Sequence, residues 1–77
     1  RGGSILPVGI RNISGSFERG DLIEVLNKSS TKIATGFSNY SSEECEEIIG
    51  RPSSEIEDLL GFSREPEVVH RDNLVLA

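Results

Sequence analysis

Residues 15–26 read Gly-Ser-Phe-Glu-Arg-Gly-Asp-Leu-Ile-Glu-Val-Leu, and this stretch decides the fold. Gly20-Asp21 predicts a turn, because glycine takes a positive φ without steric cost and aspartate bonds nearby backbone. The apolar and β-branched residues of 21–26 then predict a strand that follows the turn. Phe17, set among polar turn residues, is expected to be buried.

The next residues predict the partner strand of a hairpin. Residues 27–30 form a polar loop of sequence Asn-Lys-Ser-Ser, and the run 31–37 resumes the apolar alternation. Side chains alternate along a strand, so Ile33, Thr35 and Phe37 share one face. We expect Phe37 on that face to be buried.

Toward the N-terminus, residues 4–13 predict a less regular strand. Ser4-Ile5-Leu6 is a short apolar run that Pro7 closes. In the stretch 8–13 the apolar residues fall at irregular spacing around Gly9, which is typical of a bulged strand rather than a helix.

The segment 42–60 changes to helical spacing. Its two halves each begin with serines, continue with early acidic residues and end in glycine, which is how short helices are bounded. The sequence predicts helices over 42–49 and 53–60, with Pro52 opening the second. The apolar residues that recur at i, i+3 and i+4 are Cys45, Ile48, Ile49, Ile56, Leu59 and Leu60.

The C-terminal residues predict a final strand over about 68–76, interrupted by a polar turn at 71–73. The predicted class is therefore mainly β with two short helices (α+β). One domain of 77 residues carries strands over about 4–37 and 68–76 and a helical insertion over about 42–60.

The chain is acidic, with a formal net charge of −5, and the charge is unevenly spread. Residues 1–40 carry five basic groups and three acidic ones, whereas residues 41–69 carry nine acidic groups and two basic ones. The net charge argues against a general nucleic-acid binder, whereas the mildly basic segment 1–40 leaves contact with RNA open. The run at 43–47 is expected to be a solvated helix face rather than a divalent-ion site, because it lacks the turn glycine of a calcium loop.

Residues that carry catalytic chemistry are few. Cys45 lies on the apolar stripe of its helix, which predicts a buried and inert thiol. Cys45 and His70 are too few ligands for a structural zinc site. His70-Arg71-Asp72 spells the start of a protein-kinase catalytic loop, but Asn73 follows directly and the required glycine-rich loop is absent. We assign no catalytic, cofactor-binding or metal residue, and the absence of a signal-like or membrane-length apolar run leads us to expect a cytoplasmic location.

Three motifs resemble the PUA domain, a module named after pseudouridine synthases and archaeosine transglycosylases. They are Leu6-Pro7-Val8-Gly9-Ile10, Gly15-x-Phe17-x-x-Gly20-Asp21 and Ile33-Ala34-x-Gly36. Further motifs are similar to the C-terminal PUA domain of the bacterial glutamate 5-kinases. These are Ser38-Asn39-Tyr40-Ser41-Ser42, Leu59-Leu60-Gly61 and Val69-His70-Arg71-Asp72-Asn73. The resemblance covers nearly the whole chain.

The resemblance implies a parent enzyme that uses ATP and magnesium to phosphorylate the γ-carboxylate of glutamate in proline biosynthesis. Its active site would lie in an upstream amino-acid-kinase domain, so this segment would be a non-catalytic accessory or regulatory domain. Association of the chain with further copies of itself, as a homo-oligomer, also stays open. The resemblance also implies that the pseudobarrel lacks its first strand and helix, because PUA domains begin with both. An exposed sheet edge and apolar face would then favour dimerisation or rearrangement.

The alternative function is that of an RNA-binding PUA module of an RNA-modifying enzyme. PUA domains that bind RNA contact it around the glycine-containing loop and the last strand. The acidic segment departs from a basic RNA-binding surface, and aromatic residues for base stacking are few, so any RNA contact would depend on phosphate and shape. The matching positions for RNA or another partner are Pro7, Gly9, Ile10, Arg11, His70, Arg71 and Asn73.

Overall fold

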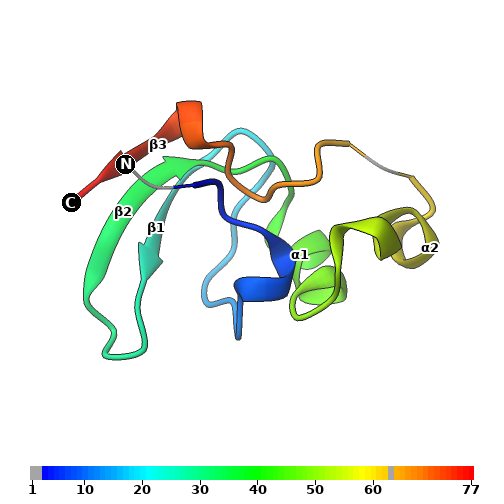
Figure 1. Cartoon of the computed structure of the whole chain (residues 1–77), viewed down its shortest axis with the longest axis horizontal. Helices are drawn as coiled ribbons and strands as arrows, with labels where there is room; N and C mark the ends of the chain where they lie inside the picture. Colours follow the sequence, from blue (N-terminus) through cyan, green and yellow to red (C-terminus); the bar gives the residue numbers. More distant parts are fainter. Residues whose placement is uncertain (1–2, 63) are drawn as a thin grey trace.

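The computed structural model of the chain describes residues 3–62 and 64–77. Within these residues, an antiparallel sheet lies beside two short helices (Figure 1). The strands are β1 (Leu22–Leu26), β2 (Lys32–Phe37) and β3 (Leu74–Leu76), in the order β1-β2-β3. The helices are α1 (Ser42–Ile48) and α2 (Ile56–Leu60), and the 3-10 turns are η1 (Pro7–Gly9), η2 (Ser53–Glu55) and η3 (Arg71–Asn73). The predicted α+β class is confirmed.

The hairpin of β1 and β2 forms where the sequence predicts it, but its buried face is the opposite one. Leu22 pairs with Phe37 across the two strands, and Phe37 is 52% exposed. The buried positions of β2 are the small residues Ala34 and Gly36. A Cβ on Gly36 would lie 2.6 Å from Val69 Cγ1, so the chain that crosses this face leaves no room for larger side chains. The prediction that Phe37 is buried is wrong for this reason.

The turn before β1 ties the strand to the first helix. Gly20 has φ 91°, and the Asp21 carboxylate accepts a hydrogen bond from the Glu18 N–H at 2.8 Å, as the turn motif predicts. The Phe17 N–H donates to Ser42 Oγ, and the Ser42 N–H donates to the Phe17 carbonyl. These bonds hold the loop against the start of α1, where Phe17 is only partly buried.

Both helices lie within their predicted ranges. A capping box starts α1, because Ser41 Oγ accepts from the Glu44 N–H while the Glu44 carboxylate accepts from the Ser41 N–H. Pro52 precedes η2, which leads directly into α2, and Gly61 ends α2 with φ 83°.

The strand predicted over residues 8–13 is wrong. Proline has no backbone N–H, and here Pro7 opens the 3-10 turn η1 instead. The Gly9 N–H bonds the Leu6 carbonyl and the Ile10 N–H bonds the Pro7 carbonyl, so these groups are used within the turn. The preceding apolar run makes only a single bridge, from Ile5 to Val69.

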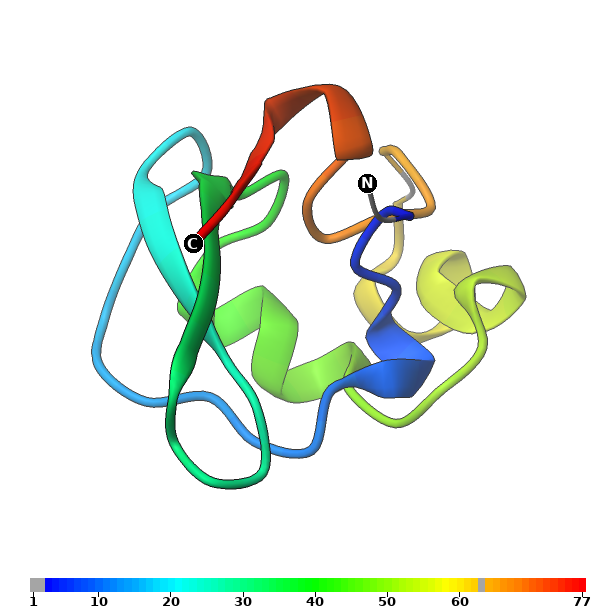
Figure 2. The same ribbon diagram turned by 60° about the vertical axis from the view of Figure 1, so that its left-hand side comes forward.

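The C-terminal strand is interrupted by a turn, as the sequence predicts. Val69 pairs with Ile5 before the turn, η3 forms the turn, and β3 follows it. In Figure 2, α1 lies between the hairpin and η1. The side chains of the core come from both helices and from the loops that flank them. The buried members are Tyr40, Cys45, Ile48, Ile56, Val68 and Val69.

Candidate interaction surfaces

Cys45 is fully buried in the core on α1. Desolvation raises the pKa of its thiol to about 11, and the carboxylates of Glu44 and Glu46 add to this effect. A thiol that stays protonated at neutral pH is a poor nucleophile and a poor metal ligand. The predicted role of Cys45 as a buried, inert core residue agrees with this environment.

The His70 side chain is used within the fold. Its Nδ1 accepts a hydrogen bond from the Asp72 N–H at 3.1 Å and so caps the turn η3. The neighbouring Arg71 has an exposed side chain, and its N–H donates to Ser4 Oγ at 3.0 Å. The Asn73 N–H donates to the His70 carbonyl, while the Asn73 side chain is exposed. The predicted residues 70–73 therefore form one compact, accessible turn.

The other predicted positions lie in and after η1. Pro7 is buried, and its carbonyl accepts from the Gly50 N–H at 2.7 Å, which anchors the turn next to the helices. Gly9 and Arg11 are exposed, and Ile10 is partly buried. The bridge between Ile5 and Val69 places the chain that leads into η1 beside the chain that leads into η3. In Figures 1 and 2 the two turns extend from this crossing in different directions. The two predicted stretches thus flank one strand bridge, and Pro7 is buried beside it.

Exposed apolar side chains lie on the outer face of the sheet, around the Glu24–Thr35 pair. Leu22, Phe37 and Val75 are 63%, 52% and 67% exposed and come from β1, β2 and β3. The register brings these positions to one face, because Leu22 pairs with Phe37 and Val75 pairs with Thr35 two residues away. Ile33 is exposed on the same face. We call these four apolar residues the outer sheet face.

A shallow groove of about 340 Å³ separates α1 from α2. We call it the helical groove. One wall carries carboxylates of α1, and the other carries apolar side chains of α2 and the following loop. Its lining residues are Glu43, Glu44, Glu47, Leu59, Leu60 and Phe62.

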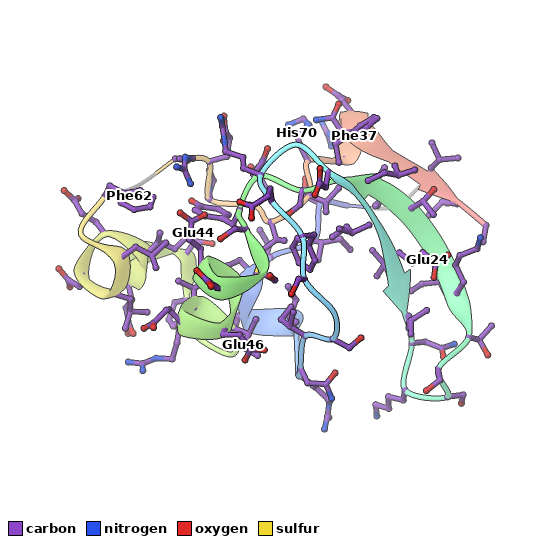
Figure 3. The ribbon with its side chains drawn as sticks, turned by 180° about the vertical axis from the view of Figure 1, so that it is seen from behind. Glu24, Phe37, Glu44, Glu46, Phe62 and His70 are labelled. Atoms are coloured by element: carbon purple, nitrogen blue, oxygen red, sulfur yellow. The ribbon has the colours of Figure 1, made fainter. Side chains whose placement is uncertain are left out.

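An arginine of the chain itself lies at one end of the helical groove. Arg64 Nη1 is 3.0 Å from the Glu44 carboxylate, and its guanidinium lies 4.6 Å from the centre of the Phe62 ring. The same guanidinium lies 5.7 Å from the Tyr40 ring, whose hydroxyl donates to the Glu65 carbonyl at 2.5 Å. Figure 3 places Glu44 and Phe62 on the same side of the molecule and Glu46 on the other side of α1.

The sequence does not predict this groove, because the acidic run is typical of a solvated helix face. The signal that could have revealed it is the spacing of the acidic residues relative to the second helix. Glu43 and Glu47 are four residues apart and so share one side of α1. An apolar cluster, Leu59-Leu60-Gly61-Phe62, follows at the end of the next helix.

The described part of the chain contains no cluster of histidine, cysteine and carboxylate groups able to hold a metal ion. None of its helices has the length and apolar character needed to span a bilayer. The remaining features of interest are surfaces: the accessible turn η3, the outer sheet face and the helical groove.

Residues 1–60 match the PUA domain, and the chain belongs to this family. It is also similar to curated proteins named glutamate 5-kinase. It is 53% identical over 73 residues to that of Pseudomonas entomophila, a match that covers 95% of this chain and 20% of the relative. It is 51% identical over 75 residues to that of Herminiimonas arsenicoxydans and 48% identical over 75 residues to that of Chromohalobacter salexigens, each match covering 97% of this chain and 20% of the relative. The chain thus spans about a fifth of the length of these relatives.

Proposed function

We propose that this chain is the non-catalytic accessory domain of a glutamate 5-kinase. The parent enzyme would transfer a phosphoryl group from ATP to the γ-carboxylate of glutamate, in the cytoplasm, as a step of proline biosynthesis. ATP and magnesium would act in an upstream amino-acid-kinase domain of the same polypeptide. The observation that carries this proposal is the 53% identity to a glutamate 5-kinase over 95% of the chain.

The chemistry of the described residues supports an accessory role in regulation or assembly. The Cys45 thiol is buried with a raised pKa, and the His70 imidazole caps a turn. The accessible features are instead an apolar sheet face and an acidic groove. Such features suit contacts with other parts of a protein better than a phosphoryl-transfer site, which requires groups positioned around phosphate.

The test compares the full-length polypeptide with a version from which residues 1–77 of this chain have been deleted. We expect the shortened enzyme to retain ATP-dependent phosphorylation of glutamate, and its feedback regulation or oligomeric state to change. Phosphorylation of glutamate and the sedimentation coefficient are measured on both proteins. Complete loss of phosphoryl transfer in a correctly folded shortened enzyme would contradict the accessory role.

RNA binding is a second candidate, and the exposure of Phe37 favours it. Phe37 follows Gly36, which pairs with Leu74, the residue directly after η3. This register places Phe37 next to η3, which carries the exposed Arg71. An accessible ring can stack on a base, and a nearby guanidinium can contact phosphate. In an RNA complex, the exposed ring would add base stacking to the phosphate and shape contacts expected from the sequence.

The RNA candidate is tested by titrating the chain with a structured RNA at two salt concentrations. Binding that weakens with salt, and weakens further in Arg71→Ala and Phe37→Ala, would support it. Lys28→Ala, an exposed change in the β1–β2 loop, is the charge-matched control for Arg71→Ala. Absence of binding at high protein concentration and low salt would rule it out.

A further inference from the structure

The helical groove has an acidic wall on α1 and an apolar wall on α2 and the following loop. We propose that it docks an arginine-bearing, apolar segment of the same polypeptide, drawn from the part outside residues 1–77. This inference rests on the proposed function, because it requires the chain to be one domain of a longer protein.

The position of Arg64 shows which chemistry the groove accommodates. Its guanidinium contacts a carboxylate, on Glu44, and an aromatic ring, on Phe62. Arginine suits such a place because its planar, weakly hydrated head pairs with carboxylates and also stacks on rings. A second guanidinium entering the groove would meet the same kinds of group.

The remaining acidic residues of the wall are available to such a segment. Glu43 and Glu47 are exposed, and within residues 3–62 and 64–77 neither forms an ion pair. They stand beside Leu59 and Leu60, which are only partly buried. The segment 41–69 as a whole carries nine acidic and two basic groups, so a basic segment is attracted and an acidic one is repelled.

The shallowness of the groove favours a tethered occupant. A stable complex between separate proteins buries about 1,600 Å² in total, far more than one short groove provides. A segment of the same polypeptide needs much less contact, because a linker holds it at an effective concentration of about millimolar. About four fifths of the length of the glutamate 5-kinase relatives lies outside the region matched by this chain, which provides ample polypeptide for such a segment.

A second copy of the chain fits the groove less well. Each copy has a net charge of −5, so two copies repel each other overall. The exposed arginines Arg11 and Arg19 lie outside the groove, so their insertion into a neighbour's groove would be a head-to-tail contact. Contacts of that kind extend into filaments unless the rotation closes a ring.

The test uses hydrogen–deuterium exchange of the full-length polypeptide. Charge reversal in Glu43→Lys with Glu47→Lys should make one segment outside residues 1–77 exchange about a hundredfold faster, since each of the two lost charge-assisted contacts changes an equilibrium by about tenfold. The milder pair Glu43→Gln with Glu47→Gln, which preserves side-chain size, should give a smaller change in the same segment. High salt should narrow the difference between the wild type and the Gln pair.

The matched control is Glu46→Lys with Glu57→Lys. These residues lie on the same two helices and are exposed, but they do not line the groove. The control should leave exchange outside residues 1–77 unchanged. Equal effects of both double variants, or no effect of the groove variants, would overturn the proposal.

Two other outcomes would identify a different occupant and so overturn the proposal. A change in sedimentation without a change in exchange outside residues 1–77 would indicate a second copy. Loss of a copurifying protein would indicate a separate partner. Glutamate phosphorylation is assayed on the same preparations. A wild-type protein without that activity counts against the proposed function. An active protein whose exchange is unchanged in the groove variants counts against the docking alone.

Discussion

Gly36 is the residue at which β2 and the C-terminal segment come closest. A Cβ at this position would lie 2.6 Å from Val69 Cγ1 and 2.7 Å from the Asn73 carbonyl oxygen. The absence of a side chain lets β3 pair with β2 while Val69 remains fully buried. The same crowding explains why the large side chains of β2 point outward to form part of the outer sheet face.

Substitution of Gly36 by alanine should therefore destabilise the chain. The new methyl group would meet a backbone oxygen, which cannot move without disturbing η3, and overpacking of this kind costs about 1–3 kcal/mol. Urea unfolding measures the change. Gly9→Ala is the control, because nothing lies within 4 Å of a Cβ built there, and it should cost clearly less. Equal costs for the two variants would contradict the close-approach argument.

The Cys45 thiol should react slowly while the chain is folded. With its pKa raised to about 11 from an ordinary value of 9.0, the thiolate fraction at pH 8 falls by about a hundredfold, and burial reduces access further. The rate of alkylation by iodoacetamide measures this, and full reactivity should return in urea. An unchanged rate on unfolding would contradict the buried placement.

The same shift gives the direction of a pH effect on stability. The unfolded chain loses the Cys45 proton near pH 9, whereas the folded chain keeps it until about pH 11. The contribution of this group is therefore fully present below pH 9 and is lost as the pH rises through that window. Cys45→Ser, compared with the wild type by urea unfolding at pH 8 and pH 10.5, should show a smaller loss of stability at the higher pH.

At the scale of elements, one carboxylate connects the start of α1 to the loop after α2. Glu44 Oε1 accepts from the Ser41 N–H at 2.9 Å and from Arg64 Nη1 at 3.0 Å. The capping box thus fixes the end of the helix and also one end of the helical groove. Two helices of seven and five residues are too short to be stable alone, so such contacts must hold them.

Removal of the cap should weaken α1. Ser41→Ala deletes the acceptor for the Glu44 N–H and should cost about 1 kcal/mol of stability. Thermal unfolding followed by circular dichroism measures the loss. Ser54→Ala, an exposed serine in η2, is the control and should change stability little. A larger loss at Ser54 than at Ser41 would show that the capping box does not stabilise α1.

The elements that the sequence predicts well are those that local physics determines. The turn at Gly20, the β1–β2 hairpin and both helices follow from turn chemistry, alternation and capping within a few residues. The bulged strand over 8–13 was a wrong prediction because its spacing admits two interpretations, and Pro7 favours the 3-10 turn η1. The burial of Phe37 was also a wrong prediction, because the buried face of β2 depends on Val69, which lies 32 residues away in sequence.

At the scale of the whole molecule, two unlike surfaces are exposed. The outer sheet face is apolar, and the helical groove is acidic. The sequence predicted two acidic helices but not the groove between them, because a groove depends on how the helices pack. It also grouped residues 7–11 with 70–73, and the bridge between Ile5 and Val69 brings the starts of these two stretches close together. Local motifs identify residues that belong to a surface, whereas the contacts between these residues depend on the tertiary arrangement.

The outer sheet face should make the 77-residue chain associate with itself as its concentration rises. An apolar patch on an open sheet is unusual in a monomer and promotes contact between copies. Sedimentation velocity over a concentration series measures this, and Phe37→Thr with Val75→Thr should shift the chain toward monomer. Lys28→Thr, in the polar loop, is the control; a chain that stays monomeric at all concentrations would contradict the expectation.

The bridge between Ile5 and Val69 also affects the order in which the domain can be made. Val68 and Val69 contribute to the core, and the Ala77 N–H donates to the Ile33 carbonyl, so the last ten residues complete both the core and the sheet. A ribosome releases residues 68–77 after the rest of this domain, which means that the emerging domain holds an incomplete core until synthesis has passed them. Contacts between such distant parts of a sequence also form slowly. Loss of residues 68–77 would therefore remove a structural closure of this domain rather than a dispensable segment.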